Sequence, residues 1–134
     1  MRKIDFIFAA CSIGLLGYLT ASTAQSESAA VSGGAGDAAK GKAIFEKRCS
    51  LCHSLDRNRE GPRLGGVYGR ISGTTEGFSY SAALKQAHIQ WNDQSLDRWL
   101  TDPDLLVPGN DMSVFLAKPD ERRNLIAYLK ASSE

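Results

Sequence analysis

The sequence predicts a small all-α domain made of several short helices. Apolar residues recur at spacings of three and four positions, and no stretch shows the sustained alternation of apolar and polar residues that marks a strand. Prolines and polar capping residues divide the helical stretches at short intervals. The 134 residues of the chain are enough for one domain.

The first helix is expected to begin after Asp37 and to end near Arg48. The Asp37 carboxylate can accept hydrogen bonds from the unpaired N–H groups of the first turn. Gly41 and Phe45 then fall on one side of this helix. A short second helix is expected within residues 79–86.

Two further helices are expected towards the C-terminus. Asp93 has the position of an N-cap for the third helix, and Pro103 ends that helix because proline has no N–H to donate. Pro119 suits the first position of the last helix, in which Leu125 and Leu129 belong to an apolar stripe.

Residues 1–24 have the pattern of an export signal. Two basic residues precede an apolar stretch, and small residues follow it before an expected cleavage after residue 24. We expect cleavage and a periplasmic location; the alternative is a retained membrane anchor, whose apolar stretch is near the lower length limit for a span. Residues 25–36 have the composition of a flexible linker, so the folded domain is expected over residues 37–134.

The charge balance excludes a general nucleic-acid binder. The chain carries 16 basic and 15 acidic side chains, and a near-neutral protein lacks the excess positive charge that attracts phosphates. The sequence also contains no glycine-rich phosphate loop. We therefore expect no nucleic acid among its partners.

The strongest functional signal is the run Cys49-Ser50-Leu51-Cys52-His53. Two cysteines three positions apart, followed directly by histidine, are typical of the attachment site of c-type haem. On a helix both thiols face the same side, so they can form thioether bonds to two vinyl groups of one porphyrin. His53 can then bind the iron from that side.

Two other functions are compatible with two cysteines at this spacing, half of a zinc site and a thiol–disulfide pair. A zinc site needs a second ligand pair, and the sequence offers only His88 and no further cysteine pair, since Cys11 leaves with the signal. A redox pair is expected between a strand and a helix, whereas this motif ends a helical stretch. We therefore expect one covalent haem c, around which short helices and the glycine-rich loop 61–77 can wrap.

The second axial ligand of the iron decides between electron transfer and haem catalysis. Met112 follows a Pro-Gly turn in a polar loop, outside any helical apolar stripe, and is the expected ligand. Core packing is the more usual role of a methionine. His88 has no comparable turn and is expected at the surface. An iron bound by His53 and Met112 has no free position, which favours an electron carrier over a peroxidase or gas-binding protein.

The chain resembles class I cytochrome c, the family of mitochondrial cytochrome c and bacterial cytochrome c2, over about residues 36–130. Besides the cysteine motif, the matching segments are Gly61-Pro62-Arg63-Leu64, Gly66-Val67-Tyr68-Gly69-Arg70, Gly77-Phe78-Ser79-Tyr80-Ser81, Ile89-Gln90-Trp91, Val107-Pro108-Gly109 and Leu125-Ile126-Ala127-Tyr128-Leu129-Lys130. The resemblance implies the class I cytochrome c fold.

The resemblance also implies roles for individual residues. Pro62 is expected to offer its backbone carbonyl to the ring N–H of His53 and so to orient the ring. Arg70, Tyr80 and Trp91 are expected to hydrogen-bond to a buried haem propionate and to compensate its charge.

Where the first and last helices cross, the resemblance implies that Gly41 and Phe45 pack against Tyr128. Trp99 stands where the family often has a tyrosine whose hydroxyl meets the methionine sulfur, so its indole N–H is the candidate replacement. Two residues instead of the usual one separate Met112 from the next phenylalanine, and the loop after the ligand is therefore expected to be shifted.

Together these features predict a periplasmic one-electron carrier rather than an enzyme. We expect a monomer that works between redox partner proteins such as a quinol–cytochrome c oxidoreductase, an oxidase or a dehydrogenase. The alternatives are a membrane-tethered or dehydrogenase-associated cytochrome subunit and, if Met112 leaves the iron, a peroxidase or gas-binding protein. Mitochondrial members carry lysines around the haem edge, whereas here acidic residues are expected on the methionine side and arginines on the histidine side.

Overall fold

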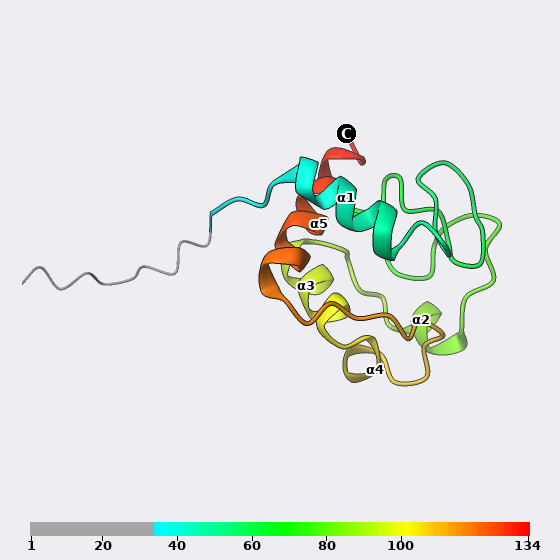
Figure 1. Ribbon diagram of the computed structural model, residues 1–134. Coiled ribbons are helices and arrows are strands. Elements are labelled where there is room, and N and C mark those ends of the chain that lie inside the picture. Colours follow the sequence, from blue (N-terminus) through cyan, green and yellow to red (C-terminus); the bar gives the residue numbers. More distant parts are fainter. Residues whose placement is uncertain (1–33) are drawn as a thin grey trace, which may run out of the picture. The chain divides into compact units, whose positions relative to one another are not determined.

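The structure, a computed structural model of the chain, describes residues 34–134 (Figure 1). In this range the chain forms the helices α1 (Ala38–Arg48), α2 (Ala82–Gln86), α3 (Asp93–Thr101), α4 (Pro103–Leu106) and α5 (Pro119–Ala131). The one β contact in these residues is an isolated antiparallel bridge between Ile71 and Gln90, so the prediction of an all-α domain is confirmed. The predicted signal at 1–24 and the linker up to residue 33 lie outside the described residues.

The first helix begins where its capping residue predicts. The Asp37 carboxylate accepts hydrogen bonds from the backbone N–H groups of Ala39 at 2.9 Å and Lys40 at 3.1 Å. These bonds lower the pKa of Asp37, and the bond from Lys40 contributes most. α1 then ends at Arg48, directly before the cysteine motif.

The N-cap of α3 was predicted one residue too late. The cap is Asn92, whose side-chain oxygen accepts from the N–H of Ser95 at 2.9 Å, while the Ser95 hydroxyl accepts from the N–H of Asn92 at 2.8 Å. This reciprocal pair satisfies two backbone donors and leaves Asp93 as the first residue of the helix. A negative charge is still favourable there because it faces the positive end of the helix dipole.

Pro103 ends α3 as predicted, but it also begins α4, a helix that was not predicted from the sequence. Asp102 lies between the two helices, and its carboxylate caps α4 by accepting from the N–H of Leu105 at 3.0 Å. α2 is shorter than the range predicted for it and is capped by Ser81. His88, shortly after α2, is exposed as predicted and has a φ of 48°, a conformation more often adopted by glycine.

The two ends of the domain meet where α1 crosses α5 (Figure 1). A Cβ atom on Gly41 would lie 2.7 Å from the Cβ of Tyr128 and would also clash with the backbone carbonyl of Asn124. The rings of Phe45 and Tyr128 pack with centroids 5.5 Å apart. The packing implied for these residues is therefore confirmed. Nearby, the N–H of Asp37 donates to the side-chain oxygen of Asn124 at 2.8 Å.

A hydrophobic core lies between α1, α3, α5 and the loops that join them. Its buried members include Phe45, Leu96, Trp99, Leu100, Leu116, Leu125, Ile126 and Leu129. Among residues 34–134, no helix is long and apolar enough to cross a membrane.

We expect Gly41→Ala to lower the free energy of unfolding by about 1–3 kcal/mol, because the added methyl group forces α1 away from the backbone of α5. Denaturant unfolding followed by circular dichroism measures this change. Lys42→Ala, on the exposed side of the same helix, is the control and is expected to change stability by less than about 0.5 kcal/mol. Equal stability of Gly41→Ala and the wild type would contradict the close approach of the two helices.

Candidate functional site

All the residues predicted to bind the cofactor line a single cavity of about 340 Å³. It is lined by Cys49, Cys52, His53, Pro62, Arg70, Tyr80, Trp91 and Met112. Leucines from α3 and α5 form much of its apolar wall. Sites of about 300–1,000 Å³ with apolar walls and a few polar groups are typical of bound cofactors.

The cysteine motif lies in a turn that follows α1 directly, rather than inside a helix. The N–H groups of Cys52 and His53 both donate to the carbonyl of Cys49, at 3.2 and 2.9 Å. The Ser50 hydroxyl donates to the carbonyl of Glu46 at 2.6 Å and ties the turn to the helix end. This turn brings both thiols and the imidazole to the cavity wall.

The Cys49 thiol does not have the properties of the attacking group of a thiol–disulfide exchange centre. Both cysteines are free and half-buried, and burial raises the pKa of Cys49 to about 11. Exchange requires a thiolate at neutral pH, and such cysteines have lowered pKa values. In the described part of the chain, no three His, Cys, Asp or Glu side chains are grouped so that they could hold a metal ion.

The loop after the motif folds back and fixes the His53 ring. The N–H of Gly61 donates to the carbonyl of Cys52 at 2.8 Å, and this places the carbonyl of Pro62 2.8 Å from Nδ1 of His53. A carbonyl only accepts, so Nδ1 carries the proton and Nε2 keeps its lone pair. Burial lowers the pKa of His53, although the bond to Pro62 opposes this, and so favours the neutral ring.

Met112 is held by contacts at both its backbone and its sulfur. Its N–H donates to the side-chain oxygen of Asn110 at 2.7 Å, and the indole N–H of Trp99 donates to its sulfur at 3.2 Å. Trp99 is buried on α3 and packs against Trp91 with ring centroids 5.4 Å apart. The indole therefore provides the donor that replaces a tyrosine hydroxyl at the sulfur.

Three predicted polar residues lie together on another part of the wall. The N–H of Trp91 donates to the carbonyl of Arg70 at 2.9 Å, so backbone pairing keeps the two residues side by side. The Arg70 guanidinium donates to the hydroxyl of Thr75 at 2.7 Å and to the carbonyls of Arg63 and Gly65. Tyr80 and Trp91 line the same cavity as Arg70.

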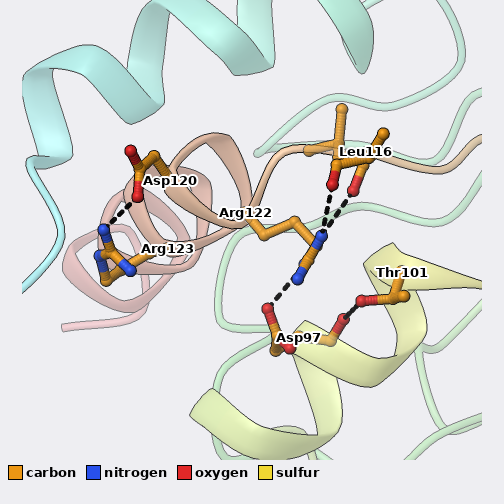
Figure 2. Close-up of polar contacts among 7 residues, drawn as sticks. Asp97, Thr101, Leu116, Asp120, Arg122 and Arg123 are labelled. Carbon is orange, nitrogen blue, oxygen red and sulfur yellow. Dashed lines mark hydrogen bonds and ion pairs between the residues drawn. The ribbon is translucent and has the colours of Figure 1, made fainter. Parts of the chain in front are cut away.

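Two residues near the site were missed in the sequence. Asn110, whose side chain also donates to Asp104 at 3.0 Å, shapes the turn that presents Met112. Arg122 on α5 is buried and contacts the segment that follows Met112 (Figure 2). Arg122 lies three residues before Leu125 and so belongs to the buried stripe of the last helix, a signal from which its burial could have been inferred.

The cavity, the two thiols and the neutral histidine define a protein with a covalently attached haem. The family model described as cytochrome c matches residues 38–133. Similar proteins include cytochrome c of Chlamydomonas reinhardtii, 46% identical over 104 residues that cover 74% of this chain and 92% of that protein. Cytochrome c of Guizotia abyssinica is 47% identical over 104 residues that cover 74% of this chain and 93% of that protein.

Among solved structures, cytochrome cH from Methylobacterium extorquens matches with a TM-score of 0.69 and 39% identity, over 72% of this chain and 99% of that one. The chain therefore belongs to the cytochrome c family. It has the class I cytochrome c fold, binds covalent haem c and is an electron-transfer protein rather than an enzyme, as predicted. Like its family, it interacts with redox partners.

We expect Gly61→Ala to displace the His53 ring, because the added Cβ would lie 2.6 Å from Nδ1. The haem-loaded variant should lose about 1–3 kcal/mol of stability, as overpacked sites usually do. Thermal unfolding and the visible spectrum measure this change. Glu60→Ala, at the exposed neighbouring position, is the control and should have the stability and the spectrum of the wild type. If Gly61→Ala also had the stability and the spectrum of the wild type, the tight contact between residue 61 and the His53 ring would be contradicted.

Proposed function

We propose that this chain is a one-electron carrier whose single haem is attached to Cys49 and Cys52 and ligated by His53 and Met112. The observation that carries the proposal is the hydrogen bond from His53 Nδ1 to the Pro62 carbonyl, which leaves Nε2 free to bind iron beside both thiols. When bound, the haem supplies the one-electron couple between Fe(III) and Fe(II).

The protein's part is to hold both ligands in the same position in either oxidation state. Pro62 fixes the tautomer and orientation of His53, and Trp99 and Asn110 hold Met112 by its sulfur and its backbone. Two fixed ligands leave no open position on the iron and so exclude peroxide and gases. A thioether favours Fe(II), which raises the reduction potential relative to a second histidine.

Arg70, Tyr80 and Trp91 are proposed to bind a haem propionate. A buried carboxylate is costly unless it is paired and hydrogen-bonded. The Arg70 guanidinium supplies positive charge at the cavity wall, and the Tyr80 hydroxyl and the Trp91 indole N–H supply two further donors at the same cavity. The three residues together therefore offer one cation and two neutral donors to the same carboxylate.

A periplasmic location is supported by the export signal predicted at residues 1–24 and by the match to a bacterial cytochrome. The redox partners proposed for a monomeric carrier there are a quinol–cytochrome c oxidoreductase, an oxidase or a dehydrogenase. Exposed carboxylates of Asp102, Asp104 and Asp111 lie on and next to the methionine loop, and exposed arginines lie near the cysteine motif. Such a surface supports partner recognition that differs from a uniform ring of lysines.

Met112→Ala is the experiment that tests the ligation. The variant should lose the weak red absorption band of methionine-bound Fe(III) and bind carbon monoxide readily when reduced. Its reduction potential should fall by on the order of 100 mV, a fraction of the roughly 0.8 V range that axial ligands cover. Ser113→Ala at the next position is the control. An unchanged red band in Met112→Ala would show that another group is the ligand.

Trp99→Phe should lower the reduction potential while leaving the red band in place. The lost N–H no longer withdraws electron density from the sulfur, so Fe(III) is stabilised. One neutral hydrogen bond of about 0.5–1.4 kcal/mol corresponds to roughly 20–60 mV for a one-electron couple. Protein-film voltammetry measures the shift. Trp99→Tyr, which restores a donor, should lie closer to the wild type, and a potential unaffected by Trp99→Phe would rule out this influence.

A further inference from the structure

The guanidinium of Arg122 connects three segments of the protein (Figure 2). Its Nε donates to the Asp97 carboxylate of α3 at 2.7 Å. One terminal nitrogen donates to the backbone carbonyls of Leu116 at 2.9 Å and Ala117 at 3.2 Å. Arg122 is 8% exposed, although arginine is seldom buried without partners.

The carbonyls that Arg122 binds belong to the segment that carries Met112. Residues 113–118 have no helix or strand of their own, and Ser113, Val114 and Phe115 are exposed. The segment is fixed at Leu116, whose N–H donates to the carbonyl of Leu100 at 2.7 Å and whose side chain is 1% exposed. Met112 is therefore held between two anchors, Asn110 on one side and the Leu116 region on the other.

The ion pair with Asp97 alone does not account for the burial of Arg122. The Asp97 side chain is 46% exposed, so solvent weakens its attraction for the guanidinium. The bonds to the two carbonyls are charge-assisted, and the bond to the Leu116 carbonyl is buried, where hydrogen bonds are stronger. The contact that ties α5 to the methionine segment is thus the stronger part of the network.

We propose that Arg122 is a positioning residue that keeps the Met112 segment against the cavity and so sets how readily the methionine sulfur leaves the iron. Asp97 orients the guanidinium. The inference rests on the proposed ligation by Met112. In the closed position the sulfur blocks the sixth position of the iron; when residues 113–118 loosen, an external ligand can compete with it.

Arg122→Lys in the haem-loaded protein tests this role, because lysine keeps the charge but has no planar fork to reach Asp97 and both carbonyls together. Imidazole should bind to the oxidised variant about tenfold more tightly than to the wild type, the effect expected from losing one charge-assisted hydrogen bond. The amide of Leu116 should exchange with solvent deuterons about tenfold faster, whereas the amide of Leu129 in the core of α5 should be unaffected.

Arg123→Lys is the matched control, since Arg123 is the next residue on α5 and pairs with Asp120 on the same helix, away from the methionine segment (Figure 2). It should bind imidazole as the wild type does. Asp97→Asn keeps the arginine and its bonds to the two carbonyls, and it should increase the affinity for imidazole less than Arg122→Lys does. It provides a second test if Arg122→Lys does not fold.

Wild-type imidazole affinity in a folded Arg122→Lys protein would overturn the proposal. A parallel rise in exchange at Leu116 and Leu129 would also overturn it, because it would show a general loss of stability. If the wild-type protein lacks the methionine red band, the ligation assignment fails instead. The Leu116 exchange rate would then still decide whether Arg122 holds the segment.

Discussion

The close crossing of α1 and α5 is the contact on which the rest of the structure depends. α1 ends at the turn that presents Cys49, Cys52 and His53, and α5 supplies leucines to the wall of the same cavity. The N–H of Asp37 bonds to the side chain of Asn124, 87 residues away in sequence. The cavity therefore depends on contacts between the two ends of the domain, and bringing such distant parts of the chain together carries a loop-closure entropy cost.

In both proposed iron ligands, a neighbouring residue determines the properties of the atom that would bind the iron. The Pro62 carbonyl places the proton of His53 on Nδ1, and the Trp99 indole directs a donor at the Met112 sulfur. Each neighbour is itself fixed, Pro62 by the backbone bonds of its loop and Trp99 by burial in α3. Each proposed ligand is thus held by a residue that is itself held in place. Such support suits an electron carrier, because the geometry of its site should stay constant between oxidation states.

Local sequence patterns were sufficient to predict most helices and the family. They failed where a residue's role depends on a contact with another residue. Asn92 and Asp93 are both good capping residues, and only the return bond from Ser95 selects Asn92. α4 has four residues, too few for a helical period to be recognised. The cysteine motif is selected by its spacing, and Met112 by the Pro-Gly turn that precedes it in a polar loop. The contacts of Arg122 could not be predicted in this way, because they join α5 to residues of two other segments.

The hydrogen bond at the methionine sulfur runs in one direction only. An indole N–H donates and cannot accept, whereas a tyrosine hydroxyl can do both and can lose its proton near pH 10. No change of pH within the range that the protein survives can therefore reverse or remove the donor beside Met112. With a tryptophan at position 99, the Met112 sulfur therefore always faces a hydrogen-bond donor, and this donor does not titrate as a tyrosine hydroxyl does.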